Sequence, residues 1–193
     1  ETLTPTPSPT ATPTPTPTAT PTETPTPMIF PDGVVLNEIL PEPRTIDWNQ
    51  DGDLNYEDEW LELYNLNALP ANLGGWAIAD ESRAFTLPVG SVIWPHGYMV
   101  LFRTQTHLAL GNDKETVALL RPDGSIADRY TYMTGPGPDA SHCRRTDGAD
   151  TWVQGCLPTL GEANRPAPPT PSPTASPAPP EREPAARPTA TPR

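Results

Sequence analysis

Short apolar runs separated by turn residues fill the middle of this chain. In residues 59–64 apolar and polar side chains alternate, which is typical of a strand that buries one face, and residues 98–102 form an unbroken apolar run typical of a central strand. Proline, glycine, asparagine and aspartate occupy the intervals between runs. The pattern predicts strands at residues 34–40, 59–64, 76–79, 83–87, 91–94, 98–102, 116–120 and 126–132, with a short final pair at 141–145 and 151–153.

The spacing of these runs predicts an all-β fold. Turn signals recur about every ten residues, and no window keeps the 3.6-residue period of a helix. One helical turn is expected within residues 104–114. Many short strands with glycine and proline between them favour an antiparallel β-sandwich, and a β-barrel is the competing architecture.

Both ends of the chain differ from the middle in composition. Residues 1–27 are almost entirely threonine, proline, alanine and serine, and residues 166–193 repeat this composition with a few charges. Such segments have too little apolar surface to offset the conformational entropy lost on folding, so we expect both to be disordered, largely extended linkers. The sequence therefore predicts one folded domain, residues 28–165, flanked by disordered Thr/Pro-rich tails.

The charge balance and the tails limit the partners and the compartment. The chain has 24 acidic and 12 basic residues, a net charge of −12, and no basic patch, which argues against a nucleic-acid partner. No apolar run reaches the roughly 18 residues of a membrane span. The sequence shows no initiator methionine and no signal peptide, so we expect a fragment or a processed form. Because Thr/Pro-rich stalks are usual outside the cytosol, we expect an exported, extracellular or cell-surface protein.

Residues 47–58 have the spacing of a calcium-binding loop. Oxygen-bearing side chains fall at steps 1, 3, 5, 9 and 12, a glycine at step 6 permits a sharp turn, and the backbone carbonyl at step 7 adds a ligand. We expect a structural calcium ion that is bound at millimolar calcium. The competing interpretation is an acidic connection whose Asn, Asp and Gly residues only form turns. The predicted ligands are Asp47, Asn49, Asp51, Asp53, Asn55 and Asp58.

The chain contains two cysteines, Cys143 and Cys156. In an exported domain we expect them to form a disulfide, which chain entropy predicts to stabilise the fold by about 3 kcal/mol. Free buried thiols are the first alternative. A zinc site that uses His142 and Cys143 is the second, and it lacks the paired cysteine spacing of such sites.

Six segments follow one another in an ordered series. They are Val35–Ile39, Asp58–Asn65, Ala71–Asp80, Ile93–Leu101, Leu120–Asp128 and Thr159–Asn164. The series resembles the lamin tail domain family, in the form found on exported bacterial proteins, over nearly all of residues 33–164. The resemblance implies an immunoglobulin-like β-sandwich and an accessory or interaction domain that is not a catalyst.

The chain departs from the animal members of that family in lacking a coiled-coil rod, so filament assembly is not implied. The calcium-like loop is an insertion between the first two strands of the family pattern, and it resembles dockerin and EF-hand loops. Asp58 stands where an EF-hand has glutamate, and a predicted strand follows it where an EF-hand has a helix. Both departures weaken the match to the calcium-binding pattern.

Two pairs of residues invite a catalytic interpretation. Glu38 and Glu62 are candidate paired carboxylates for glycoside hydrolysis, but solvated strand faces carry glutamates routinely. Ser141 and His142 are a candidate nucleophile and base, but they lack elbow glycines and an evident orienting acid. We therefore expect no enzyme, and we expect the three histidines to be structural or exposed.

The sequence leaves two main functions open. The first is a non-catalytic extracellular interaction or display module on proline-rich stalks, stabilised by calcium, whose partner is an unidentified protein or a cell-surface glycan. The alternative is a carbohydrate-binding accessory domain of a secreted hydrolase, in which exposed aromatic rings stack on sugars. Trp60 shares a strand face with Glu62, so it is the aromatic residue expected to be exposed for stacking.

Overall fold

The structure, a computed structural model, describes residues 30–165. Its elements are β1 (Val34–Leu40), η1 (Tyr56–Asp58), β2 (Trp60–Asn65), β3 (Ala71–Asn72), β4 (Ala77–Ala79), β5 (Ala84–Thr86), β6 (Val92–Ile93), β7 (Tyr98–Phe102), α1 (Arg103–Thr106), β8 (Glu115–Leu120), β9 (Ile126–Tyr132), β10 (Ser141–Arg144) and β11 (Trp152–Cys156). The predicted tails at 1–27 and 166–193 lie outside the described residues, so the domain boundaries stay a prediction.

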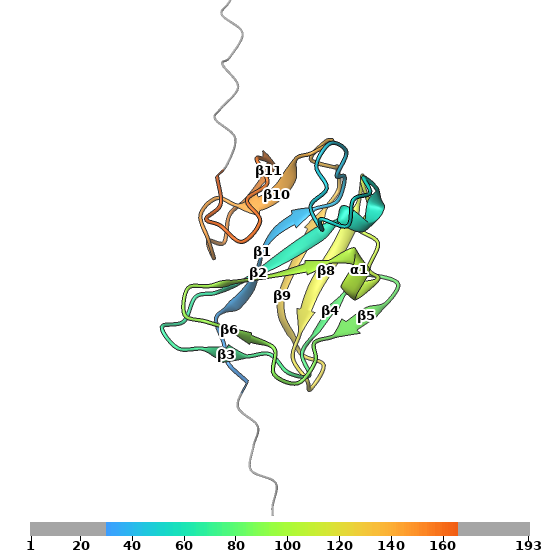
Figure 1. Cartoon of the computed structure of the whole chain (residues 1–193). Helices are drawn as coiled ribbons and strands as arrows, with labels where there is room; N and C mark the ends of the chain where they lie inside the picture. The colour runs from blue at the N-terminus through green and yellow to red at the C-terminus, as the bar shows by residue number, and fades with distance from the viewer. Residues whose placement is uncertain (1–29, 166–193) are drawn as a thin grey trace, which may run out of the picture. The chain divides into compact units, whose positions relative to one another are not determined.

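Two antiparallel sheets pack as a β-sandwich (Figure 1). One sheet has five strands in the order β11-β10-β1-β2-β7, the other has four in the order β5-β4-β8-β9, and β3 pairs separately with β6. Strand β1 lies against β8 and β9 of the opposite sheet. Because each sheet keeps its own edges, the architecture is a sandwich and not a barrel. The predicted all-β, immunoglobulin-like sandwich is confirmed.

The hydrophobic core lies between the two sheets. Leu36, Ile39 and Leu63 of one sheet and Ile78 and Leu119 of the other are all fully buried. Burial of each such side chain contributes roughly 2 kcal/mol. The burial of Leu61 and Leu63 explains the apolar positions in the alternating sequence of β2.

Strand positions agree closely with the sequence pattern, but the place of one strand in the sheet was predicted wrongly. Residues 98–102 were expected to form a central strand, whereas within residues 30–165 β7 pairs only with β2 and lies at the edge of the five-stranded sheet. Four of its five residues are half-buried and only Leu101 is buried. A continuous apolar run predicts that both faces of a strand are at least partly covered by other residues. It does not predict how many strands pair with it.

The predicted disulfide is confirmed. Cys143 of β10 and Cys156 of β11 are joined with an S–S distance of 1.98 Å and a Cα–Cα distance of 6.1 Å. Both cysteines of the chain are therefore used, which excludes the free-thiol and zinc alternatives. The bond holds β11, an edge strand, to the rest of its sheet.

Candidate functional site

The connection between β1 and β2, residues 41–59, carries the predicted calcium ligands. It ends in the short 3-10 helix η1, whose N-cap is Asn55. The Asn55 side chain accepts a hydrogen bond from the backbone N–H of Glu57 (2.6 Å), and the Asp58 carboxylate accepts one from the backbone N–H of Asn55 (3.0 Å). This reciprocal capping box fixes the direction in which the chain enters β2.

The tip of the connection is closed by its own acidic side chains. The Asp47 carboxylate accepts hydrogen bonds from the backbone N–H groups of Asp51 (3.2 Å) and Gly52 (2.9 Å). The Asp51 carboxylate in turn accepts one from the N–H of Asp53 (2.9 Å). Gly52 has φ +96°, so the sharp turn predicted at this glycine is present.

Asp58 closes the base of the same connection. Its side chain is buried and accepts hydrogen bonds from the backbone N–H groups of Trp48 (2.8 Å) and Asn49 (3.1 Å), besides that of Asn55. One carboxylate thus links residues 48 and 49 near the start of the loop to Asn55 near its end. Hydrogen bonds to charged groups of this kind are worth roughly 1.5–3 kcal/mol each.

The oxygen atoms of this loop suit a hard cation in type, and the loop backbone donates hydrogen bonds to several of them. Across residues 30–165, no group of three or more Asp, Glu, His or Cys side chains lies close enough together to hold a metal ion. The carboxylates of Asp47, Asp51 and Asp58 therefore do not converge, and each accepts hydrogen bonds from the loop backbone instead. Calcium binding stays a prediction.

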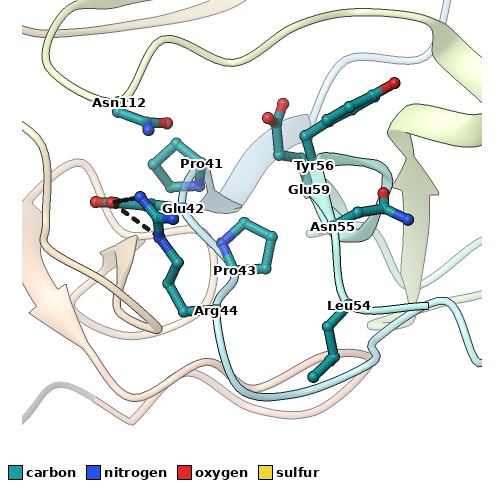
Figure 2. Close-up of a pocket in the computed structure, with 9 residues that line it drawn as sticks. All are labelled: Pro41, Glu42, Pro43, Arg44, Leu54, Asn55, Tyr56, Glu59 and Asn112. Atoms are coloured by element: carbon teal, nitrogen blue, oxygen red, sulfur yellow. Dashed lines mark hydrogen bonds and ion pairs between the residues drawn. The ribbon is translucent and has the colours of Figure 1, made fainter.

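A pocket of about 310 Å³ opens beside the loop (Figure 2). Pro41 and Pro43 lie between the Glu42–Arg44 ion pair on one side and Tyr56 on the other. The Arg44 guanidinium donates two hydrogen bonds to the same Glu42 oxygen, at 2.8 and 3.2 Å. The remaining lining residues are Leu54, Asn55, Glu59 and Asn112. The pocket thus combines one aromatic ring with amide, carboxylate and guanidinium groups.

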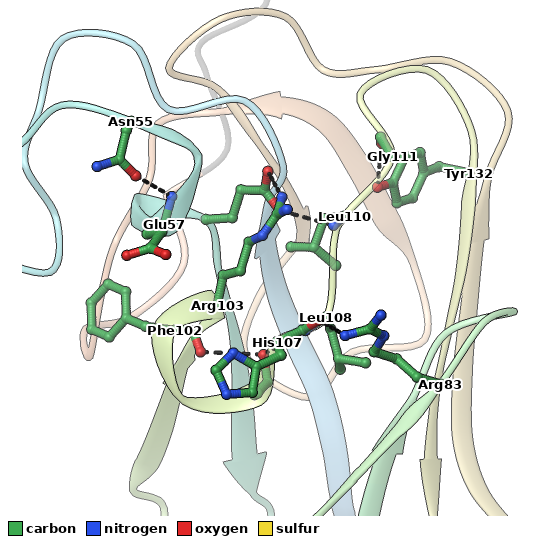
Figure 3. A network of polar contacts seen from close by, with 12 residues as sticks. Asn55, Glu57, Arg83, Phe102, Arg103, His107, Leu108, Leu110, Gly111 and Tyr132 are labelled. Carbon is green, nitrogen blue, oxygen red and sulfur yellow. Dashed lines mark hydrogen bonds and ion pairs between the residues drawn. The ribbon is translucent and has the colours of Figure 1, made fainter.

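Contacts of Arg103 and Leu110 hold Tyr56 and Glu59, two residues in the wall of this pocket. The Arg103 guanidinium lies 4.4 Å from the centre of the Tyr56 ring, and Tyr56 remains 61% exposed. The same guanidinium donates to Glu59 (2.8 Å), whose other oxygen accepts from the backbone N–H of Leu110 (2.9 Å) (Figure 3). Burial raises the pKa of the Glu59 carboxyl to about 7, although Leu110 and Arg103 both favour its charged form.

Glu38 and Glu62 were expected on a solvated strand face, and this expectation is wrong. They are cross-strand partners in β1 and β2 and both are fully buried. The side chain of Glu38 accepts hydrogen bonds from the hydroxyls of Ser141 (2.5 Å) and Thr159 (2.7 Å). Glu62 accepts from the backbone N–H of Gly161 (2.7 Å). Neither carboxyl is accessible to a substrate, so they do not form the cleft that glycoside hydrolysis needs.

A third acid, Asp147, extends this buried network. The Asn37 amide donates to both Glu62 (3.0 Å) and Asp147 (3.0 Å), and the Tyr98 hydroxyl donates to Asp147 (2.7 Å). Within residues 30–165, no basic side chain forms an ion pair with any of these three acids. Burial raises the pKa of Glu38, and it raises that of Glu62 to about 8, with a smaller contribution from the neighbouring acids.

The serine and histidine that invite a nucleophilic interpretation are used in the core. The Ser141 hydroxyl donates to Glu38, as described above. His142 is buried, stacks on Tyr132 with 4.3 Å between ring centres, and has its Nδ1 3.2 Å from the Tyr130 hydroxyl. Burial lowers the pKa of His142 to about 4, which leaves a neutral ring at neutral pH. This histidine is structural, as expected.

The prediction that Trp60 is exposed for stacking on a ligand is wrong. Trp60 is 1% exposed and packs edge-on against Trp48, with 5.9 Å between ring centres. The error came from taking Glu62 as a sign of a solvated face, because Glu62 is itself buried. Among the described aromatic side chains, the most exposed are Trp94 (70%) and Tyr56 (61%). Tyr56 is the first residue of η1 and directly follows the N-cap Asn55.

Comparison with protein families identifies the framework that carries these sites. A family model described as Lamin Tail Domain matches residues 31–134. The chain belongs to the lamin tail domain family. No curated protein matches the chain. The family is immunoglobulin-like and of the non-catalytic, interaction type, which agrees with the sandwich found here.

The lamin tail domain match ends before the last two strands of the sandwich. β10 and β11 follow residue 134, yet β10 pairs with β1 in the middle of the five-stranded sheet. Thr159 and Gly161, which bind the buried glutamates, also lie beyond the match. Residues 135–165 therefore complete the fold of this lamin tail domain. None of the helices in residues 30–165 is both long and apolar enough to cross a membrane.

Proposed function

We propose that this lamin tail domain is a non-catalytic extracellular interaction or display module, carried between proline-rich stalks on an exported bacterial protein. The Cys143–Cys156 disulfide carries the proposal, because such bonds persist in oxidising compartments outside the cytosol. The composition of residues 1–27 and 166–193 supports stalks on both sides. The domain would then hold a binding surface away from the cell or matrix.

The redox state of the native protein tests the compartment. Intact cells and culture medium are treated with a thiol-reactive maleimide polymer before lysis, and the protein is detected by its change in mass. We expect the protein in the medium or surface fraction, unlabelled until a reductant exposes Cys143 and Cys156. Recovery of the protein from the cytosol with both thiols labelled would contradict the proposal.

We further propose that residues 47–58 bind one structural calcium ion with Asp47, Asn49, Asp51, Asp53, Asn55 and Asp58. Support comes from the ligand spacing and from the oxygen atoms, which are the donors that calcium prefers. Asp51 and Asp53 are exposed, so the tip of the loop is open to an ion from solvent. Binding would draw these oxygen atoms together around the ion and hold the start of β2.

Calcium titration with a matched pair of variants tests this site. For the wild-type chain we expect heat on titration with calcium, with an affinity of about 10⁻⁴–10⁻³ M, and a higher melting temperature in calcium. Asp47→Asn should abolish both responses. Asp80→Asn is the control, because Asp80 caps a turn in a different loop through the N–H of Ser82. No heat at several millimolar calcium would favour the polar turn.

The pocket beside the loop favours carbohydrate binding as a second candidate function. Tyr56 offers an exposed ring, and Arg44, Glu42 and Asn112 offer polar groups around the same pocket, a combination that suits a sugar. Binding to a glycan array and to insoluble polysaccharides tests it. We expect Tyr56→Ala to reduce any retention at least tenfold, and Trp94→Ala, which removes the other exposed ring, to leave it unchanged.

A further inference from the structure

Strand β7 lies at an edge of the five-stranded sheet and lacks the charges, prolines and bulges that usually prevent an edge strand from pairing with another chain. Its sequence, Tyr98–Phe102, contains no charge, proline or glycine, and its pairing with β2 shows no register shift. The other long edge strands differ: β9 carries Asp128 and Arg129, and β11 contains Gly155 at φ +78°. Natural proteins block exposed edges with such charges, bulges or prolines, so an unblocked edge is expected to have a partner.

The phase of the β2–β7 ladder shows which backbone groups of β7 point outward. The N–H of Arg103 donates to the carbonyl of Glu59 (2.8 Å), and at the other end the N–H of Asn65 donates to the carbonyl of Gly97 (3.1 Å). In an antiparallel ladder alternate residues share these bonds, so the odd-numbered residues of β7 bond to β2. The even-numbered residues therefore direct their N–H and C=O groups away from the sheet.

One of these outward residues is capped within the chain. Phe102 donates its N–H to the Gln105 side chain (3.2 Å), and its carbonyl accepts from the Thr106 hydroxyl (3.2 Å). Tyr98 and Val100 remain. In the range 30–165 no strand pairs with this side of β7, so their two N–H and two C=O groups have no strand partner.

The positions of these free groups match a second copy of the same strand. Tyr98 and Val100 lie symmetrically on either side of Met99. A two-fold axis through Met99, perpendicular to the sheet, places Tyr98 opposite Val100 of the second copy and Val100 opposite its Tyr98. All four free groups then form hydrogen bonds, and neither of the capped groups of Phe102 is needed.

The surface beside β7 is apolar and suits the same contact. A groove of about 260 Å³ runs between the edges of the two sheets, with Phe85 and Leu87 on one side and Met99 and Leu101 on the other. No charged side chain lines it. Val89, which adjoins the groove residue Pro88, is 98% exposed. Two copies of this acidic chain can therefore meet here without opposing like charges.

We propose that β7 forms the interface of a homodimer, in which two copies pair antiparallel about Met99 and join their five-stranded sheets into one continuous sheet. In this arrangement the two Met99 residues face each other as a non-hydrogen-bonded pair, with Cα atoms about 4.5 Å apart. A module displayed on stalks would then present its binding surfaces in pairs. The dimer does not depend on calcium or on the pocket beside Tyr56.

Site-directed crosslinking of the full chain tests the register. The chain has no free cysteine, so a Met99→Cys substitution introduces the only reactive thiol. We expect mild oxidation to convert most of this variant to a covalent dimer of twice 20.8 kDa, because the paired positions suit a disulfide. Ile126→Cys, at a half-exposed position on the edge strand β9, is the control and should stay monomeric. Equal crosslinking of both variants would overturn the proposal.

Light scattering after gel filtration tests the dimer without crosslinking. The wild-type mass should rise from one towards two chains between low and high micromolar concentration. Val100→Pro removes an outward N–H that the ladder to β2 does not use, so this variant should keep its fold and stay monomeric at all concentrations. A melting curve checks the fold of the variant. A monomeric wild-type chain at high concentration, or a folded Val100→Pro dimer, would refute the interface.

Discussion

At the scale of single residues, the buried acids distinguish this domain from an ordinary β-sandwich. Glu38 and Glu62 face each other across β1 and β2, no basic side chain of residues 30–165 forms an ion pair with either, and their oxygens accept hydrogen bonds from hydroxyl, amide and backbone donors. Two charges in this environment would be costly, so burial raises the pKa of Glu38 and raises that of Glu62 to about 8. We therefore expect the Glu62 carboxyl to favour its protonated form in the folded chain at neutral pH.

Because burial raises the pKa of Glu62, we expect the free energy of unfolding to fall as the pH rises, which is the opposite of the usual effect of a carboxyl group. The pKa of Glu62 rises from 4.5 in the unfolded chain to about 8 in the folded one, so its contribution is complete below pH 4.5 and is lost as the pH rises towards 8. We expect urea denaturation to show greater stability at pH 5 than at pH 8. Glu62→Gln should reduce the difference in the free energy of unfolding between pH 5 and pH 8 by on the order of 3 kcal/mol. Glu81→Gln, at an exposed position, should retain it.

Asp58 supports a second prediction at this scale. Its buried carboxylate receives three backbone N–H groups, all of which lose their acceptor in Asp58→Ala. We expect a loss of roughly 3 kcal/mol in the free energy of unfolding, measured in a calcium chelator, because buried donors without partners are costly. An unchanged stability in chelator would mean that the loop is closed by other contacts.

At the scale of elements, the β10–β11 hairpin depends on the disulfide. In the described part of the chain β11 is an edge strand that pairs with β10, and the Cys143–Cys156 bond joins the two. A bond that closes a loop of this length contributes about 3 kcal/mol. We expect reductant to lower the melting temperature of the wild-type chain, and hydrogen exchange to quicken first in β11. The double variant Cys143→Ala/Cys156→Ala should melt at the lower temperature with or without reductant.

The strands also show which structural features a local sequence pattern can predict. Strand bounds could be predicted because side-chain alternation is local, and β1, β7 and β9 begin and end at the predicted residues. The two-residue strands β3 and β6 are too short for a period, and β3 was not predicted at all. Strand order in the sheets depends on pairing between distant segments, so the edge position of β7 could not be obtained from its own residues.

At the scale of the whole molecule, the folded domain is longer than the family match. The match ends at residue 134, but the donors to Glu38 and Glu62 at Thr159 and Gly161 lie beyond it. We expect a chain of residues 30–165 to fold alone with a cooperative melting transition in circular dichroism. A chain of residues 30–134 should fail to do so, because β1 loses its neighbour β10 and both glutamates lose donors. Cooperative melting of the shorter chain would show that the last hairpin is dispensable.

The sequence by itself determined the features that depend on near neighbours in the chain. These are the positions of the longer strands, the turn at Gly52, the acidic loop around it and, from two cysteines in a stalk-flanked domain, the disulfide. Tertiary structure alone decided which charged and aromatic side chains are buried. Glu38 is buried and accepts a hydrogen bond from Thr159, 121 residues away, and Trp60 of the same sheet is buried where exposure was expected. Whether a side chain is buried depends on which segment packs over its face of the sheet. The alternation of residues within one strand gives no information about a segment more than a hundred residues away.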